Sequence, residues 1–158
     1  MMPEHTVTLT VLGRAVAFTS RHEGYLRGFL GADLSELPIC RLAATAPPGS
    51  AYLDAGANVG VTAIAAALSR PDVRVIAFEP VPSNYELLER NIVAAGAPNC
   101  TAVRAAVSSR AGVATISDDG PWSRIGVPGP QIETIALDGW VASSIPETSI
   151  ALIKIDVE

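Results

Sequence analysis

The sequence predicts an α/β fold in which helices flank an incomplete parallel sheet, and three observations support that prediction. Three short apolar runs each end on an acidic residue: 51–53 on Asp54, 74–78 on Glu79 and 149–155 on Asp156. Stretches with apolar residues at helical spacing follow the first two runs. Of the 158 residues, 49% are hydrophobic and only 5% aromatic, so aliphatic side chains must fill the core, as is usual where helices pack on a parallel sheet.

Residues 1–48 are expected to form a lead-in, made of a β-hairpin and helical segments, that precedes the core in 49–158. Val7, Leu9 and Val11 alternate with polar residues, and a glycine follows before a second apolar run. Residues 19–46 carry apolar residues at mixed helical spacing, and the stretch 47–50 (PPGS) then breaks the chain.

The core begins with a strand, a glycine loop and a helix. The run 51–53 leads into a turn bracketed by Gly56 and Gly60, and 61–68 reads as an Ala-rich buried helix. The second strand, 74–78, must end near Glu79, because the prolines at 80 and 82 cannot continue a central strand.

A further helix is expected after the second strand. Ser83 and Glu86 have the spacing of a capping box, and Gly96 suits the helix C-terminus. The β-like runs 101–107 and 113–117 are joined by a loop short enough for a hairpin.

The rest of the chain before the last strand is less regular. Residues 118–131 are rich in Gly and Pro and read as a loop or flap. Trp122 and Arg124 in this loop could contact a substrate, although a plain surface loop is the simpler interpretation. Residues 135–141 read as a short amphipathic segment, and 149–155 is the last strand.

Composition narrows the function. The net charge of −5, without a basic run, gives no electrostatic reason to bind nucleic acid. The N-terminus lacks the pattern of a signal peptide and no apolar run reaches membrane-spanning length, which predicts a cytoplasmic protein without a membrane span. Cys40 and Cys100 have no metal-site spacing, and we expect two buried thiols and no metal site.

The strand tips predict the binding site, because parallel sheets bind ligands beyond the carboxyl ends of their strands. The glycine loop does not fit a dinucleotide fingerprint: counted from Gly56, the second and third glycine positions hold Asn58 and Val61. A carboxylate at Asp54 would repel a pyrophosphate but suits a ligand with an ammonium group and a sulfonium. Glu79 can accept hydrogen bonds from both hydroxyls of a ribose.

Four sequence blocks, DAGANVG, VIAFEPVPSNYELLERNI, AAVSSRAGVATI and IALIKIDVE, resemble the successive blocks of the FkbM family of methyltransferases. The resemblance covers roughly residues 51–158, with the blocks in family order and at family spacing. It implies a Rossmann-like class I methyltransferase fold with a seven-stranded sheet. It also implies S-adenosylmethionine as the methyl donor and O-methylation of a hydroxyl on a sugar or other natural-product acceptor, a small molecule.

The resemblance also implies roles for single residues. Those expected to bind the cofactor lie in the glycine loop, at the second strand end and after the third strand: Asp54, Gly56, Ala57, Asn58 and Gly60, then Glu79 and Pro80, then Ala106 and Val107. Asp156 is expected beside the methyl group, as a general base, a metal ligand or a hydrogen-bond partner of the cofactor's amino group.

The family pattern continues beyond Glu158, so the chain is expected to be a fragment that holds the cofactor half. Its fourth strand would lie beside the first and expose an apolar edge, through which the chain could self-associate. We expect weak cofactor binding and no turnover. Two alternatives remain open from the residues alone: a nicotinamide-dependent oxidoreductase and a non-catalytic cofactor-binding module.

Overall fold

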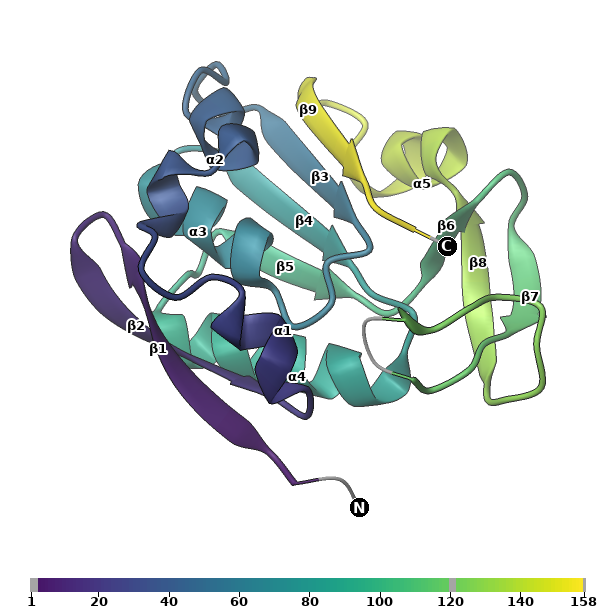
Figure 1. The fold of residues 1–158 in the computed structure, drawn as a ribbon. Helices are drawn as coiled ribbons and strands as arrows, with labels where there is room; N and C mark the ends of the chain where they lie inside the picture. Colours follow the sequence, from purple (N-terminus) through teal and green to yellow (C-terminus); the bar gives the residue numbers. More distant parts are fainter. Residues whose placement is uncertain (1–2, 120–121, 158) are drawn as a thin grey trace.

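The computed structural model describes residues 3–119 and 122–157 and has a four-stranded parallel sheet at its centre (Figure 1). The elements in chain order are β1 (His5–Val11), β2 (Arg14–Ser20), α1 (Glu23–Arg27), η1 (Leu34–Glu36), α2 (Pro38–Ala43), β3 (Ala51–Ala55), α3 (Val61–Ser69), β4 (Arg74–Phe78), α4 (Pro82–Ala95), β5 (Cys100–Val103), β6 (Ala106–Ser108), β7 (Gly112–Thr115), β8 (Gln131–Ala136), α5 (Leu137–Ser144) and β9 (Ile150–Ile155). The predicted α/β fold, with helices flanking a parallel sheet, is confirmed.

The central sheet has the strand order β5-β4-β3-β9, and each neighbouring pair is parallel. The last strand therefore lies beside the first strand of the core, as the sequence predicts. Asp54 lies in β3 opposite Lys154 of β9, while Glu79 and Asp156 directly follow β4 and β9. The three acidic residues thus meet at one edge of the sheet.

Alternate residues of the central strands pack on two different cores. Tyr52 and Val75 face a core that also holds buried residues of α2, α3, α4 and the N-terminal hairpin. Leu53, Ile76 and Phe78 face a second core with β8 and α5, where the Phe78 ring meets the Trp140 ring edge to face. Because both faces of β3 are covered, all five of its residues are buried.

The N-terminal hairpin is confirmed: β1 and β2 pair antiparallel through a tight turn at Leu12 and Gly13. Leu9 and Phe18 are buried in the same core as α3 and α4. The side chain of Asn91 on α4 accepts a hydrogen bond from the Thr19 backbone N–H at 2.9 Å and donates to its carbonyl at 3.0 Å. The hairpin is therefore fixed to α4 by apolar packing and by a paired amide.

The expected hairpin between 101–107 and 113–117 is wrong. The first run splits into β5 and β6, and a second sheet has the order β6-β8-β7, with β8 parallel to β6 and antiparallel to β7. Thr134 of β8 lies opposite both Ala106 and Gly112. β8, a strand from later in the chain, thus lies between the two runs. The length and composition of the loop that joins the runs cannot predict this pairing. The segment 135–141 likewise divides between β8 and α5.

The expected capping box on α4 is also wrong. The helix begins at Pro82, and its N-cap, Val81, makes no side-chain cap hydrogen bond. Proline is favoured at a first helical position, because its fixed φ suits the helix and its missing N–H needs no partner there. Ser83 instead donates to the Asp118 carboxylate at 2.5 Å. The C-terminal stop at Gly96 is confirmed, with φ of 66° in the left-handed region.

β9 is an edge strand of the central sheet within the described residues, and Ile153 and Ile155 on it are 45% and 64% exposed. Self-association through this edge stays a prediction. No helix in the described ranges is long and apolar enough to cross a membrane.

Candidate functional site

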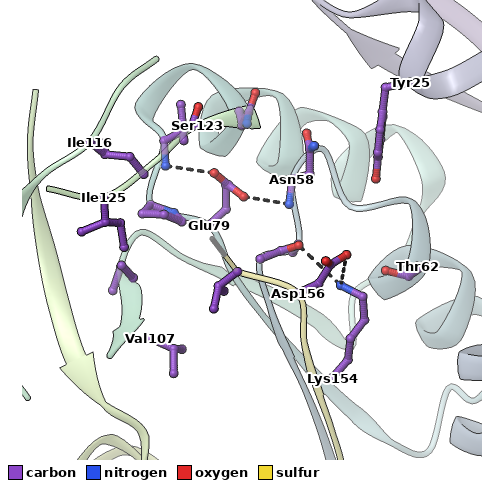
Figure 2. A pocket seen from close by; sticks show the side chains of 18 of the residues that line it. Tyr25, Asn58, Thr62, Glu79, Val107, Ile116, Ser123, Ile125, Lys154 and Asp156 are labelled. Atoms are coloured by element: carbon purple, nitrogen blue, oxygen red, sulfur yellow. Dashed lines mark hydrogen bonds and ion pairs between the residues drawn. The ribbon is translucent and has the colours of Figure 1, made fainter. Parts of the chain in front are cut away.

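A cavity of about 240 Å³ lies at the carboxyl ends of β3, β4 and β9 (Figure 2). One end is apolar, with Val107, Ile116 and Ile125, and the other end holds polar groups of Tyr25, Thr62, Lys154 and Asp156. Glu79 and Asn58 lie between the two ends. The site predicted from the strand tips is therefore a single elongated cavity with chemically different ends.

Glu79 is 4% exposed and points into the middle of the cavity. Its Oε2 accepts a hydrogen bond from the Asn58 backbone N–H at 2.8 Å, and its Oε1 accepts one from the Val81 N–H at 2.9 Å. Burial raises the pKa of Glu79 to about 7, although these hydrogen bonds oppose the shift. The Asn84 side chain also donates to this carboxylate and lowers its pKa, so one acceptor position remains for a ligand.

The loop after β3 approaches β9 too closely for a side chain at Gly56. A Cβ there would lie 2.0 Å from the Asp156 carbonyl oxygen, and the φ of 82° also favours glycine. Asn58 has a positive φ of 52°, and this conformation turns its backbone N–H toward Glu79. The Asn58 Oδ1 atom is buried without a hydrogen-bond partner among the described residues, which leaves an acceptor free at the cavity wall.

Ala57 and Gly60 of the cofactor loop differ in whether they line the cavity. Ala57 lines the cavity, whereas Gly60 lies outside it, as the N-cap of α3 with φ of 92°. A Cβ at Gly60 would lie 2.5 Å from the Leu88 Cδ1 atom, so this glycine allows α3 and α4 to pack closely.

Asp54 lies beneath the cavity, is fully buried and is not among the lining residues. Its Oδ2 accepts a hydrogen bond from the Thr62 hydroxyl at 2.8 Å, and its Oδ1 accepts one from the Lys154 ammonium at 2.9 Å. The cation beside Asp54 is therefore Lys154 of β9, and this ion pair holds the Lys154 side chain at the polar end.

Lys154 joins three acceptors at the polar end of the cavity. Besides Asp54, its Nζ lies 3.5 Å from the Gly56 carbonyl oxygen and 3.5 Å from the Asp156 Oδ2. The Asp156 side chain is 79% exposed, in contrast to the buried Asp54. Asp156 lines the cavity and has a carboxylate that a ligand can reach.

The remaining sequence candidates lie along the cavity toward its apolar end. Pro80 follows Glu79 at the cavity wall, and Ala106 and Val107 line the part formed by β6. Ile116 and Ile125, from the loop that follows β7, complete this apolar wall. A flat apolar group fits these surroundings better than a charged one.

Sequence reasoning missed several lining residues. Lys154 lies between two isoleucines of the last block. Because it precedes Asp156 by two residues, the period of a strand places both side chains on the same side of the sheet, and this spacing could have identified it. Tyr25 and Phe29, from the lead-in, line the cavity, and their rings meet edge to face. Ser123 and Ile125 in the Gly/Pro-rich loop line it too, next to the predicted Trp122 and Arg124.

Comparison with known families and proteins gave consistent matches. The family model described as the methyltransferase FkbM domain matches residues 54–158. The methyltransferase sdnD of Sordaria araneosa is 34% identical over 74 residues, which span 46% of this chain and 29% of that protein. The ribosomal RNA small subunit methyltransferase G of Frankia alni is 38% identical over 55 residues, which span 35% of this chain and 21% of that protein. The matches thus span less than a third of these two relatives.

Two solved structures are similar to part of this chain. A SAM-dependent methyltransferase from Agrobacterium tumefaciens has a TM-score of 0.46 and 20% identity, over 63% of this chain and 32% of that one. TYW2 of M. jannaschii in complex with AdoMet has a TM-score of 0.45 and 18% identity, over 62% of this chain and 42% of that one.

Proposed function

The chain belongs to the methyltransferase FkbM domain family, and from that premise we propose that its cavity binds S-adenosylmethionine for methyl transfer to a hydroxyl of a small molecule. The observation that supports this most is the order of groups along the cavity: an apolar end, a buried acid and then a polar end. S-adenosylmethionine has the same order, with adenine, ribose and a charged amino-acid group joined through a sulfonium.

The free groups of the cavity fit this ligand. Glu79 can accept a hydrogen bond from a ribose hydroxyl, while the Asn58 and Val81 N–H groups and the Asn84 side chain hold it in place. Asn58 Oδ1 is a buried acceptor without a partner among the described residues, which suits a ligand ammonium. Val107, Ile116 and Ile125 supply apolar contacts for a flat base.

The charges at the polar end also fit a cationic ligand. Lys154 neutralises the buried Asp54, so the acidic groups that line the cavity are Glu79 and Asp156. Attraction between a sulfonium and these carboxylates is stronger in a partly buried cavity than in bulk water.

When bound, S-adenosylmethionine would supply an electrophilic methyl group. The chain would contribute alignment of the acceptor oxygen and exclusion of water. We assign Asp156 as the residue that orients the acceptor hydroxyl and takes its proton, since its carboxylate lines the polar end and is open to solvent. Lys154, 3.5 Å from Asp156 Oδ2, would hold that carboxylate in position.

For the acceptor, we favour a hydroxyl of a sugar or another natural product. The net charge of −5 makes a polyanionic acceptor a poor match. The oxidoreductase and the non-catalytic module remain as competing outcomes of the experiment that follows.

Calorimetric titration of the chain with S-adenosylhomocysteine and, separately, with NAD tests the ligand. We expect heat of binding for S-adenosylhomocysteine and none for NAD, and a weaker signal for the Glu79→Ala variant. Binding of NAD instead would overturn the proposal. Methyl transfer from labelled donor to candidate sugars, measured by mass spectrometry, tests the reaction. An intact cofactor site without transfer to any hydroxyl acceptor would favour a non-catalytic module.

A further inference from the structure

The lead-in contributes part of the cavity wall, although it lies outside the region that the family model matches. Tyr25 on α1 lines the polar end, and its side chain points from the lead-in toward the part of the cavity wall that holds Asn58 and Thr62 (Figure 2). Leu26, the next residue, is fully buried in the core, and this anchors α1 over the cavity. Tyr25 is therefore held at the site by packing.

The donors at the polar end are unequally available. The Thr62 hydroxyl donates to Asp54, and the Lys154 ammonium is shared among Asp54, Asp156 and the Gly56 carbonyl. Among the described residues, no hydrogen bond uses the Tyr25 hydroxyl, so it remains available as a donor to a ligand in the cavity that Asn58 also lines. Burial and the nearby acids raise the pKa of Tyr25, so the hydroxyl keeps its proton at neutral pH.

An amino-acid group brings a carboxylate into surroundings that are otherwise rich in acids. That carboxylate needs hydrogen-bond donors, and an unpaired one would lose much of the binding energy. The first turn of α3 supplies backbone N–H groups, since its N-cap, Gly60, makes no side-chain cap. The Tyr25 hydroxyl, which lines the same cavity, is a second donor.

We propose that the Tyr25 hydroxyl donates a hydrogen bond to the carboxylate at the amino-acid end of the cofactor, so that the lead-in is part of the cofactor site. This inference rests on the proposed function, because it needs a ligand with an amino-acid end. Asn58 Oδ1 would accept from the ammonium of the same group, and Phe29 would supply only apolar contact.

Two ligands distinguish a hydrogen bond from Tyr25 to the carboxylate from a general contribution of Tyr25 to the cavity wall. S-adenosylhomocysteine has the amino-acid end, and 5′-methylthioadenosine has the adenosine without it. In calorimetric titrations of the chain, Tyr25→Phe should weaken S-adenosylhomocysteine binding by about tenfold or more, the effect of losing a hydrogen bond to a charged group. The same variant should leave 5′-methylthioadenosine binding within about twofold, because the ring and its packing remain.

Phe29→Leu is the matched control, since it changes the same wall without removing a polar group, and it should affect both ligands equally. Circular dichroism of each variant verifies folding. An equal loss for both ligands with Tyr25→Phe, or no loss for either, would overturn the role of the hydroxyl while the proposed function stands. If the unchanged chain binds neither ligand, the proposed function fails and this inference fails with it.

Discussion

The tips of β3 and β4 each carry a buried acid, but the two acids have different partners. Asp54 at the tip of β3 is fully buried and pairs with the Lys154 ammonium and the Thr62 hydroxyl. Glu79 after β4 is 4% exposed and pairs with backbone N–H groups of Asn58 and Val81, without a cation beside it.

The difference separates an acid that is paired with a cation of the same chain from an acid that faces the cavity; the predicted role of Asp54 in binding the cofactor stays a prediction. The charge of Asp54 is neutralised by a cation of the same chain, and its carboxylate lies beneath the cavity wall. Burial raises the pKa of Glu79 to about 7, and this carboxyl faces the cavity. A buried acid without a protein cation is a group that a cationic or hydroxyl-bearing ligand can complement.

The largest effect should come from removing the cation beside Asp54. Lys154→Met leaves the Asp54 charge buried without compensation, and we expect the free energy of unfolding to fall by about 3 to 5 kcal/mol. Urea titration followed by circular dichroism measures this. The double variant Asp54→Asn with Lys154→Met should recover much of the loss. A loss below about 1 kcal/mol for Lys154→Met would show that Asp54 does not depend on this pair.

A smaller effect, on the pH dependence of the free energy of unfolding, is expected at Glu79. Its folded-state pKa of about 7 lies above the ordinary value of 4.5, so the folded chain binds an extra proton between these pH values and stability falls as pH rises through that window. Between about pH 5 and pH 8 the unchanged chain should lose about 2 to 3 kcal/mol of unfolding free energy relative to Glu79→Gln.

Urea titrations at several pH values measure this difference, and Glu86→Gln is the control. Glu86 is an acid on α4 with a side chain that is 69% exposed, so its substitution removes the same charge without the burial. The Glu86→Gln curve should run parallel to that of the unchanged chain. A parallel curve for Glu79→Gln as well would contradict the assigned cause.

The smallest effect on stability is expected at Asp156, the second carboxylate beside Lys154. Its side chain is 79% exposed, so Asp156→Asn should change the free energy of unfolding by less than about 0.5 kcal/mol. If Asp156 takes the acceptor's proton, the same substitution should lower the rate of methyl transfer by about a hundredfold or more. A large loss of stability would show instead that Asp156 belongs with Asp54 as a structural acid.

Local patterns in the sequence predict the central sheet and the strand tips well, because apolar runs mark β3, β4 and β9, and prolines mark the end of β4. They also place Glu79 and Asp156 at the cavity. They do not predict β8 between β6 and β7, since that pairing joins residues distant in the chain. The capping box at Ser83 fails because the helix starts at Pro82, so that its N-cap is Val81, two residues before Ser83.

The same limit applies to the site. The charge partner of Asp54 could not be predicted, because its identity depends on the register between β3 and β9. Tyr25 was missed for a related reason: its helix has five residues and little periodicity, and only the packing of Leu26 brings it over the cavity.

Asp54 and Lys154 are separated by 100 positions along the chain. As the polypeptide leaves the ribosome, β3 emerges long before β9, so the acid at its tip stays without a counter-charge until nearly all of the described chain has been synthesised. Closing such a long loop costs entropy, which the ion pair and the sheet hydrogen bonds must offset. A one-residue slip of β9 would turn Lys154 to the opposite face of the sheet. The cavity is therefore complete only when the last strand pairs with β3 in its correct register.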